Sequence, residues 1–541
     1  MRTVTTCLFA LAMIASCPAV TRAQTLVRDI NPGLSSSRPS LLTDVDGMLF
    51  FCAFDGTTAG DELWRSDGTE AGTVLVKDIR PGFIGSSMEE LTYVNRTLFF
   101  AANDGATGVE LWKSDGTEAG TVLVKDIQPG LAGSTPTGLT NVNGVLFFAA
   151  TDSTGAELWR SDGTEAGTVR VKDIQFGPDG SRPQNLTGVG GTLFFSATDG
   201  EVGVELWKSD GTEQGTVLVE DIRSGSGGST PSLLTQMNGV LFFSATDGLS
   251  GFELWRSDGT ESGTVLVKDV RGGPADSFLQ HLTNVDGTLF FSATDGRNGA
   301  ELWRSDGTTA GTVLVKDIRQ GTGDSLPNYF RGVGSRLFFS ADDGVNGAEL
   351  WKSDGTEAGT VLVKDIGQGA SSGFVLFESA SVRGELYFGA LTDAQGFELW
   401  RSDGTEAGTV LVEDINRGAG SSGLREFTLV GETLFLAATD GSSGIELHAL
   451  EPSDLVSAEQ RRSATGDVLS VIGHTVRLNV ERAQSVRVSV YDIIGREVAV
   501  LYAGVVSGPE SWTAPSLASG AYFVRAVGEN LALTAPLVVV R

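Results

Sequence analysis

The sequence is poor in cysteine, and this shortage limits the chemistry that it can carry. Of its three cysteines, Cys7 and Cys17 fall in an N-terminal segment that we expect to be removed, which leaves Cys52. Neither a disulfide framework nor a cysteine-based metal site is therefore expected. Histidine is equally scarce. The three histidines are far apart and have no second histidine or cysteine pair nearby, so a zinc site would lack ligands; they are His281, His448 and His474.

Positive charge and long apolar segments are also in short supply. The chain has 39 Lys and Arg against 68 Asp and Glu, a net charge of −29, with a pI near 4.5. Nucleic acid and anionic lipid both require clustered Lys and Arg, so we expect neither as a partner. After the N-terminal segment no stretch approaches the ~18 apolar residues of a membrane-spanning helix. The acidity is that of a protein kept soluble outside the cell.

The first residues have the pattern of an export signal. Arg2 precedes an apolar run from Cys7 to Ala15, and small residues end at Ala23. This pattern predicts a signal peptide over residues 1–23 and a mature protein that begins at Gln24. The spacing of Ile14-Ala15-Ser16-Cys17 leaves a lipoprotein signal as the alternative. Either route predicts an extracellular or outer cell-surface protein.

Glycine, with 72 residues, is about twice as frequent as in average proteins, and an internal repeat accounts for much of it. Eight copies of Glu-Leu-Trp continue with Arg or Lys and then Ser-Asp-Gly-Thr, and a decayed copy, Glu446-Leu447-His448, closes the series. The full copies begin at residues 62, 110, 157, 205, 253, 301, 349 and 398, so the period is 47 to 49 residues. A repeat of this length must be interpreted before any single motif.

Each repeat is predicted to form four short antiparallel strands. In residues 76–124, apolar runs at 91–94, 98–102, 110–112 and 121–124 are separated by turns. The first turn is Asn143-Gly144 or Asp286-Gly287 in other repeats, the composition of a two-residue type I′ hairpin. A four-stranded unit of this length is typical of a β-propeller blade.

The two ends of the repeat region complement each other. Val27-Arg28-Asp29-Ile30 matches an isolated fourth strand, whereas residues 427–450 supply only the first three strands of a last unit. We therefore predict an all-β fold, a β-propeller of eight or nine four-stranded blades. Nine blades are preferred, with the last blade closed by the first segment. An open solenoid is the alternative.

Residues that recur in every repeat are predicted to be structural. The eight tryptophans of Glu-Leu-Trp would fill the gaps between blades. They are Trp64, Trp112, Trp159, Trp207, Trp255, Trp303, Trp351 and Trp400. The Glu of Glu-Leu-Trp and the Asp of Lys-Asp-Ile would be hydrogen-bonding elements of the scaffold, because catalytic carboxylates need a singular environment. Ser-Asp-Gly-Thr segments such as 66–69 and 305–308 resemble the Asp-box hairpins of sialidase-like propellers, where Asp and Ser satisfy backbone donors.

The sequence therefore predicts no catalytic, cofactor-binding or metal-binding residues. Calcium in the blade turns remains a minor alternative, although one Asp before one Gly is not a calcium loop. Gly369-Ala370-Ser371-Ser372-Gly373 matches Gly-x-Ser-x-Gly but lies in a Gly/Ser loop, where a nucleophile elbow is not expected. Non-repeated residues such as Asp324, Tyr329 and Glu378 form no recognisable catalytic set.

Binding residues are expected in the loops that follow each Asp-Ile, because these loops differ between repeats on a rigid scaffold. They include residues 80–83, 175–178, 271–274 and 320–323. Their composition does not indicate a ligand.

The repeat resembles the bacterial Glu-Leu-Trp-x-x-Asp-Gly-Thr (ELWxxDGT) repeat family over residues 27–450, within a predicted propeller domain of residues 24–452. This resemblance implies a surface-exposed or secreted protein without an assigned activity.

A linker is predicted over residues 453–464, followed by a small Ig-like β-sandwich over residues 465–541. Its segments Tyr491-Asp492-Ile493-Ile494-Gly495-Arg496 and Leu517-Ala518-Ser519-Gly520-Ala521-Tyr522 resemble the C-terminal sorting domain of type IX secretion (the Por system). The resemblance implies export across the outer membrane through the type IX machinery, followed by release or surface attachment. An unrelated sandwich domain is the alternative.

The leading functional hypothesis is a secreted, non-enzymatic adhesion or ligand-binding platform, with a glycan or a protein at the cell surface as its partner. The alternative is a carbohydrate-active hydrolase or lyase with one or two non-repeated acids in the central funnel. A third hypothesis is a calcium-stabilised scaffold.

Overall fold

The computed structural model describes residues 25–57, 59–450, 461–462, 468–472, 475–492, 496–513, 520–528 and 532–539. The expected signal peptide (1–23), Gln24, His474 and nearly all of the expected linker (453–464) lie outside the described residues. The chain divides into two compact units, Met1–Ala449 and Leu450–Arg541. The division falls close to the end of the repeat.

The first unit contains nine four-stranded antiparallel sheets, which we number as blades. Blade 1 has β2 (Ser40–Val45), β3 (Met48–Phe54), β4 (Asp61–Ser66) and β5 (Val74–Lys77). Blade 2 has β6 (Glu89–Val94), β7 (Thr97–Asn103), β8 (Val109–Ser114) and β9 (Val122–Lys125). Blade 3 has β10 (Thr137–Val142), β11 (Val145–Asp152), β12 (Gly155–Ser161) and β13 (Val169–Lys172). Blade 4 has β14 (Gln184–Val189), β15 (Thr192–Thr198), β16 (Val204–Ser209) and β17 (Val217–Glu220). Blade 5 has β18 (Ser232–Met237), β19 (Val240–Thr246), β20 (Phe252–Ser257) and β21 (Val265–Lys268).

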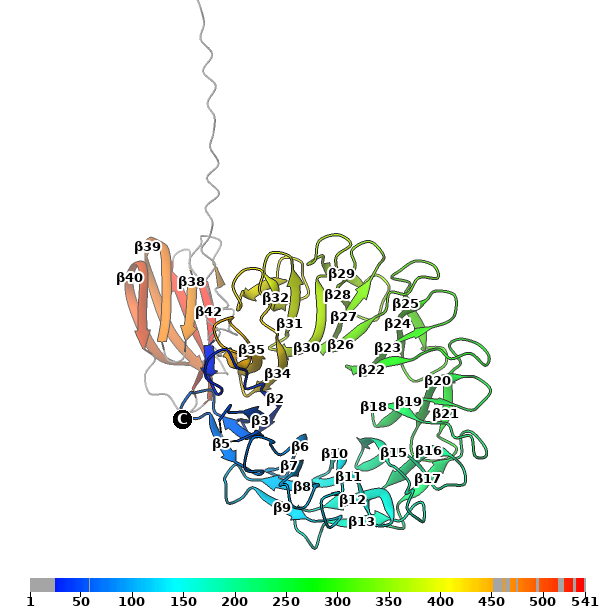
Figure 1. The fold of residues 1–541 in the computed structure, drawn as a ribbon. Helices are drawn as coiled ribbons and strands as arrows, with labels where there is room; N and C mark the ends of the chain where they lie inside the picture. The colour runs from blue at the N-terminus through cyan, green and yellow to red at the C-terminus, as the bar shows by residue number, and fades with distance from the viewer. Residues whose placement is uncertain are drawn as a thin grey trace, which may run out of the picture. The chain divides into compact units, whose positions relative to one another are not determined.

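Blade 6 has β22 (Gln280–Val285), β23 (Thr288–Thr294), β24 (Ala300–Ser305) and β25 (Val313–Lys316). Blade 7 has β26 (Asn328–Val333), β27 (Arg336–Asp342), β28 (Ala348–Ser353) and β29 (Val361–Lys364). Blade 8 has β30 (Phe374–Val382), β31 (Glu385–Thr392), β32 (Gly396–Ser402) and β33 (Val410–Glu413). Blade 9 has β34 (Arg425–Val430), β35 (Thr433–Ala438), β36 (Glu446–Leu450) and β1 (Thr25–Arg28). Together they confirm the predicted all-β propeller of nine blades (Figure 1).

Blade 9 closes the ring as predicted, because it takes strands from both ends of the repeat region. β1 pairs antiparallel with β36, and Leu26 lies opposite His448. The backbone N–H of Ile30 donates to Glu446 Oε2 at 3.0 Å, and β2 contacts β34 across the same seam. The open solenoid is therefore wrong, since a solenoid would leave both ends unpaired.

The first strand of each blade lies at the inner side of the ring and the fourth at the outer side (Figure 1). Two-residue turns join the first and second strands. In blade 1 the turn residues Asp46 and Gly47 have φ of 51° and 84°, and Val45 lies opposite Met48. These are the left-handed conformations that a type I′ turn requires, and they confirm the predicted hairpin.

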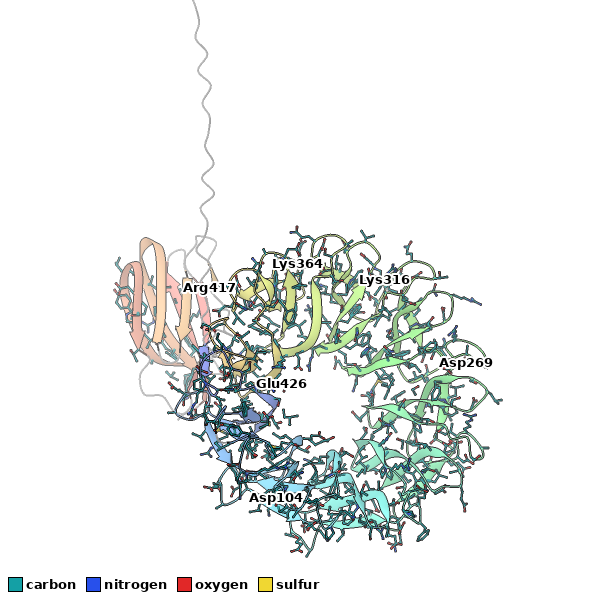
Figure 2. All side chains as sticks on the ribbon, viewed as in Figure 1. Asp104, Asp269, Lys316, Lys364, Arg417 and Glu426 are labelled. Atoms are coloured by element: carbon teal, nitrogen blue, oxygen red, sulfur yellow. The ribbon has the colours of Figure 1, made fainter. Side chains whose placement is uncertain are left out.

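The apolar core is divided among the seams between blades. In one seam Trp112 of blade 2 packs with Leu63 and Val76 of blade 1, and Trp112 is 6% exposed. Lys side chains of the preceding blade lie over several of these indole rings. Lys364 Nζ lies 5.8 Å from the centroid of the Trp400 ring and donates to Thr409 O at 2.8 Å. Figure 2 labels Lys316 and Lys364 in two such outer strands. The tryptophans therefore fill the seams, as predicted.

The Ser-Asp-Gly-Thr hairpins hold themselves together by local hydrogen bonds. Asp67 Oδ1 accepts hydrogen bonds from the backbone N–H and the hydroxyl of Thr69, at 2.9 and 2.7 Å. Ser66 Oγ accepts from the N–H of Gly68 at 3.1 Å, and Gly68 has a φ of 91°. The hydrogen bonds from Thr69 lower the pKa of Asp67. The structural role predicted for this segment is confirmed.

The buried Glu of each Glu-Leu-Trp holds the loop that leads to the next blade. Glu110 Oε1 accepts from the N–H groups of Gln128 and Ser134, at 3.1 and 2.8 Å. Its Oε2 accepts from the N–H of Ile127 at 3.1 Å and from the Ser134 hydroxyl at 2.5 Å. Burial raises the pKa of Glu110 above its ordinary value. This Glu is a scaffold element, as predicted.

The second unit is also all-β. Its strands are β37 (Arg461–Arg462), β38 (Val468–Ile472), β39 (Thr475–Asp492), β40 (Glu497–Thr513), β41 (Gly520–Gly528) and β42 (Ala532–Val539). They form one six-stranded sheet in which β39 pairs with β38, β40 and β41. Val476, Val488 and Val524 contribute to its core. The described strands belong to a single sheet, and the two-sheet sandwich stays a prediction.

Candidate functional site

The loops that join one blade to the next lie at the same end of the ring as the turns between second and third strands. The N–H of Gly60, in the β3–β4 turn, donates to Gly82 O in the β5–β6 loop at 2.9 Å. In the next two blades the loop N–H groups of Thr135 and Arg182 donate to Val109 O and Ala156 O, near the start of the third strands. We call this end of the ring the loop face. The Ser-Asp-Gly-Thr hairpins lie at the opposite end, because successive turns of a meander alternate between its ends.

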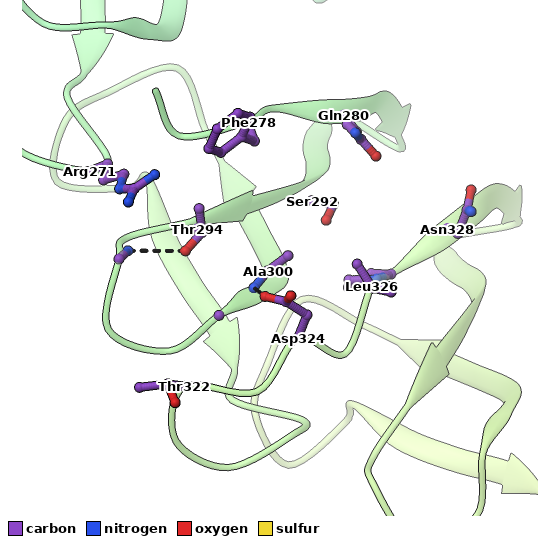
Figure 3. Close-up of a pocket in the computed structure, with 13 residues that line it drawn as sticks. Arg271, Phe278, Gln280, Ser292, Thr294, Ala300, Thr322, Asp324, Leu326 and Asn328 are labelled. Carbon is purple, nitrogen blue, oxygen red and sulfur yellow. Dashed lines mark hydrogen bonds between the residues drawn. The ribbon is translucent and has the colours of Figure 1, made fainter. Parts of the chain in front are cut away.

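A pocket of about 530 Å³ opens on the loop face between blades 5, 6 and 7. Arg271 and Phe278 come from the β21–β22 loop, and Thr322, Asp324 and Leu326 come from the β25–β26 loop. The remaining lining residues are Gln280, Ser292, Thr294, Gly296, Gly299, Ala300, Pro327 and Asn328. Figure 3 shows Arg271 and Phe278 on one side of the pocket and Leu326 and Asn328 on the other. The volume lies within the range of small-ligand sites.

Two apolar side chains flank the pocket on strained backbone. Phe278 and Leu326 have φ of 51° and 47°, and their side chains are 60% and 64% exposed. Each directly follows the buried serine that starts its blade, Ser277 or Ser325. Bulky residues rarely adopt the left-handed region, which costs about 1–3 kcal/mol. The same left-handed backbone occurs at the equivalent positions of other blades, as at Ser87 and Thr135, with φ of 50° and 48°. The exposed apolar side chains, and not the backbone, therefore single out this pair as a candidate binding position.

Polar groups surround these two side chains. Arg271 Nη1 donates to Asp276 O at 3.1 Å, and its guanidinium carbon lies 5.8 Å from the centroid of the Phe278 ring. Asp324 Oδ1 accepts from the N–H of Ala300 at 2.8 Å, one of the bonds drawn in Figure 3. The pocket therefore combines apolar faces with hydroxyl, amide, guanidinium and carboxylate groups, which come from strands β22, β23 and β26 and from the two adjacent loops.

The structure brings part of the expected loop set together here. Arg271 and Thr322, from two of the variable loops, line the pocket, and so does the non-repeated Asp324. Tyr329 and Glu378 do not line it. Glu378 Oε2 instead accepts from the N–H of Phe427 on the next inner strand at 3.3 Å.

Other inner-strand glutamates form similar ties between blades. Glu90 Oε2 accepts from Leu139 N–H at 3.0 Å, and Glu426 Oε2 from Leu42 N–H at 3.3 Å. Burial raises the pKa of Glu426. Figure 2 labels Glu426 on the inner side of blade 9. These carboxylates bridge neighbouring inner strands, which is a scaffold role.

Sequence reasoning missed Phe278, Gln280, Leu326 and Asn328. The sequence signal that could have found Phe278 and Leu326 is the residue type at the position directly after the buried serine. It is Ser87, Thr135, Arg182 or Thr230 in blades 2–5 but Phe278 and Leu326 in the two blades that follow. A change from polar to apolar at an equivalent position points to a local role that the repeat itself does not need.

A second pocket, of about 540 Å³, lies at the seam between blades 8 and 9. His448 lines it in place of the Trp of other blades, and Glu413 stands where most blades have Lys. His448 is 3% exposed, and burial lowers its pKa to about 4. His281 is remote from this pocket, and its ring stacks at 5.6 Å from that of Phe330.

The Gly369–Gly373 motif lies in the loop between β29 and β30, where Gly369 N–H donates to Asp365 Oδ2 at 3.1 Å. Asp365 thereby caps its own loop, as Asp269 does by accepting from Gly273 N–H at 2.9 Å. No three His, Cys, Asp or Glu side chains in the described part of the chain are grouped so that they could hold a metal ion. The described residues also include no helix long and apolar enough to cross a membrane.

No protein-family model matches this sequence, and no curated protein sequence matches it significantly. Solved structures with a similar fold include puromycin hydrolase, at 14% identity and a TM-score of 0.35, over 65% of this chain and 58% of that chain. Another is a puromycin-hydrolyzing peptidase of Mycobacterium tuberculosis, at 11% identity and a TM-score of 0.35, over 66% of this chain and 60% of that one. A third is prolyl oligopeptidase B from Galerina marginata, at 11% identity and a TM-score of 0.36, over 68% and 55% of the two chains.

This chain thus spans little more than half the length of these structures, and the similarity is distant. The class of protein, a nine-bladed β-propeller followed by a small β domain, rests on the strand pairing described above.

Proposed function

We propose that this chain is a non-enzymatic, extracellular ligand-binding platform that recognises a saccharide at the pocket between blades 5, 6 and 7. The observation that carries the proposal is the pairing of Phe278 and Leu326 with the polar groups of Gln280, Ser292 and Asn328 around one pocket. Sugars present both C–H faces and hydroxyl groups, so they require apolar surface and hydrogen-bonding groups side by side. A volume of about 530 Å³ has room for a short oligosaccharide.

Binding without cleavage is favoured by the carboxylates of the pocket. Glycoside hydrolysis generally uses two carboxyl groups on either side of the scissile bond. Asp324 is the single acidic residue among those that line the pocket. Its Oδ1 already accepts the Ala300 N–H.

The second unit is proposed to be a type IX secretion sorting domain, and the whole chain a member of the ELWxxDGT repeat family. The support is the pair of sequence blocks around Tyr491 and Tyr522. Of their described residues, Tyr491 lies opposite Phe523 and Asp492 opposite Tyr522. The resulting location is the outside of the cell. Removal of residues 465–541 should keep the chain inside a type IX-secreting host. Secretion of the shortened chain at the normal level would contradict this assignment.

The saccharide proposal is tested by a glycan array with the full chain, with and without calcium. We expect binding of a limited set of glycans, and Phe278→Ala or Gln280→Ala should weaken it by about tenfold or more. Phe83→Ala is the matched control, because Phe83 is also exposed on the loop face, far from the pocket in sequence. Cleavage of a bound glycan would replace this proposal with the hydrolase alternative. Equal loss of binding in all three variants would remove the pocket from consideration.

A further inference from the structure

The most exposed large apolar side chains of the first unit gather on its loop face. Nine such side chains are at least 60% exposed, and all belong to blade-to-blade loops or to turns between second and third strands. They are Leu34, Phe83, Ile84, Leu131, Phe176, Leu249, Phe278, Leu326 and Val345. None lies in a Ser-Asp-Gly-Thr hairpin. The two faces of the ring therefore differ in their exposed apolar side chains, which are concentrated on the loop face. An exposed apolar set of this size indicates a contact surface.

Five of these side chains form an arc over four consecutive blade-to-blade loops. Leu34 follows blade 9, Phe83 and Ile84 follow blade 1, Leu131 follows blade 2, and Phe176 follows blade 3. Their exposures lie between 71% and 87%. We call this set the apolar arc.

Three of the four loops use the same local device. Pro32-Gly33, Pro81-Gly82 and Pro129-Gly130 stand directly before Leu34, Phe83 and Leu131. These glycines have φ of 96°, 111° and 109°. Pro-Gly fixes a turn, so the apolar side chain after it is held outward at little further entropy cost. The equivalent positions in the loops after blades 4 to 8 are small or polar: Ser226, Pro274, Thr322, Ala370 and Ala419.

The four blade-to-blade loops of the arc themselves carry little negative charge, whereas Asp55, Asp61, Asp104 and Asp152 lie in or next to the neighbouring turns between second and third strands. The Asp that opens each of these loops turns toward its own backbone or the interior. Asp29 Oδ2, for example, accepts from Gly33 N–H at 3.2 Å, and Asp126 Oδ1 is buried. Asp179 is the one further acidic residue in the four loops, where Arg38, Arg80 and Arg182 also lie. Arg182 Nη2 is 3.8 Å from Asp179 Oδ1.

We propose that the apolar arc binds a lipid bilayer by inserting its side chains into the interface of an uncharged, zwitterionic leaflet. Leu34, Phe83 and Leu131 stand at equivalent positions of three consecutive loops, four residues after Ile30, Ile79 and Ile127, so these three side chains are expected to reach a flat surface together. Phe176 stands two residues earlier in its own loop. The apolar side chains come from four separate loops, as the adjacent pair Phe83 and Ile84 in one loop and as a single side chain in each of the other three. A fluid bilayer accepts such separate insertions, whereas a protein interface needs a contiguous core. The net charge of −29 disfavours an anionic leaflet.

The test is flotation of the full chain with phosphatidylcholine vesicles at about 0.15 M and about 0.5 M salt. We expect binding that salt changes little, because apolar insertion carries it. Phe83→Ser combined with Ile84→Ser, and separately Leu131→Ser, should each lower the partition coefficient by about tenfold. These side chains are exposed, so thermal midpoints should stay unchanged. Val505→Ser, at an exposed position of the second unit, is the matched control and should bind as the unaltered chain does.

Three results would overturn the proposal. The first is no binding to phosphatidylcholine, and the second is binding that appears only with phosphatidylserine and disappears in salt. The third is self-association in sedimentation velocity without vesicles that the arc variants abolish, which would make the arc a contact between copies of this chain. The Phe278→Ala variant should bind vesicles at the normal level. This result would show that the apolar arc binds vesicles independently of the saccharide pocket.

Discussion

The hydroxyl of Ser134 donates to the buried Glu110 carboxylate, with Oγ 2.5 Å from Oε2. The same pairing recurs where Ser181 meets Glu157 and where Ser325 meets Glu301, at 2.5 and 2.6 Å. Ser325 Oγ also lies 3.2 Å from Ala300 O. When the acid is protonated, the Ser325 hydroxyl can therefore donate to that carbonyl and accept a hydrogen bond from the O–H of Glu301. The Ser325–Glu301 pair therefore has hydrogen bonds for both the ionised and the protonated acid.

Stability should consequently fall as the pH rises from about 5 to about 8. Burial raises the pKa of five of these glutamates to about 7, from an ordinary value of 4.5: Glu62, Glu205, Glu253, Glu301 and Glu398. The folded state then binds more protons than the unfolded chain between these values. Its extra stability is complete below about 4.5 and is lost as the pH passes about 7.

Thermal midpoints between about pH 5 and pH 8 measure this effect. Glu301→Gln removes one titrating group. The difference between the thermal midpoints at about pH 5 and at about pH 8 should therefore become smaller, although both midpoints should be lower than those of the unaltered chain. A midpoint that rises with pH would contradict the assignment. Between about pH 6.5 and about pH 4 the buried His448, whose pKa is lowered to about 4, works in the opposite sense. Its unfolded form takes up a proton below its ordinary value of 6.5, so its contribution declines as the pH falls.

Val27→Asp should open the ring. Val27 is 5% exposed and packs with Leu447 and Phe51 in the seam that β1 closes. Burying an unpaired charge there costs several kcal/mol. β1 has no hairpin to its own blade and is held by its pairing with β36 and by contacts across this seam. Small-angle scattering should show a larger radius of gyration, and proteolysis should cut near residues 29–39. Val124→Asp, at the equivalent position of blade 2, is the control. There β9 is tied to β8 by a short hairpin, so the ring should stay closed.

Trp159→Ala should destabilise the seam between blades 2 and 3 by about 3–5 kcal/mol. Trp159 is 6% exposed and packs with Leu111 and Val124 of blade 2. Lys125→Met, which removes the cation 5.9 Å from the Trp159 ring centroid, should cost only about 1 kcal/mol. Hydrogen exchange is the suitable measurement, because opening is local in a repeat fold. In the Trp159→Ala variant, faster hydrogen exchange is expected only in blades 2 and 3. Equally faster exchange in all blades would contradict the view that each seam opens separately.

Removal of divalent cations should leave the thermal midpoint within about 1 °C. The Oδ1 atom of each hairpin Asp is already used, as in Asp115, which accepts from the N–H and hydroxyl of Thr117 at 2.9 and 2.7 Å. Scanning calorimetry with and without chelator measures this. A clear drop on chelation would restore the calcium-scaffold hypothesis. Asp115→Asn, which keeps an acceptor, should be milder than Asp115→Ala.

The sequence was sufficient to predict the blades and their closure, because both depend on patterns that recur. Repeated residues such as Trp112 and Glu110 meet the same surroundings in each blade, so their roles follow from repetition. The pocket depends instead on departures from the repeat. Phe278 and Leu326 depart from the repeat in side chain only, because Ser87 and Thr135 have the same left-handed backbone at the equivalent positions. Neither Phe nor Leu signals such a backbone in the sequence. The inner-strand bulges at His281 and Tyr329, with φ of 56° at both, were hidden for the same reason.

The pairing of β1 with β36 makes the order of the blades along the chain arbitrary. Every other blade is continuous in sequence. A loop that joins two blades connects the same two strands wherever the polypeptide starts. A circular permutant that begins in the loop between β17 and β18, with residues 450 and 25 joined by a short linker, should therefore assemble the same ring. In that permutant blade 9 becomes continuous, and the break moves to the seam between blades 4 and 5.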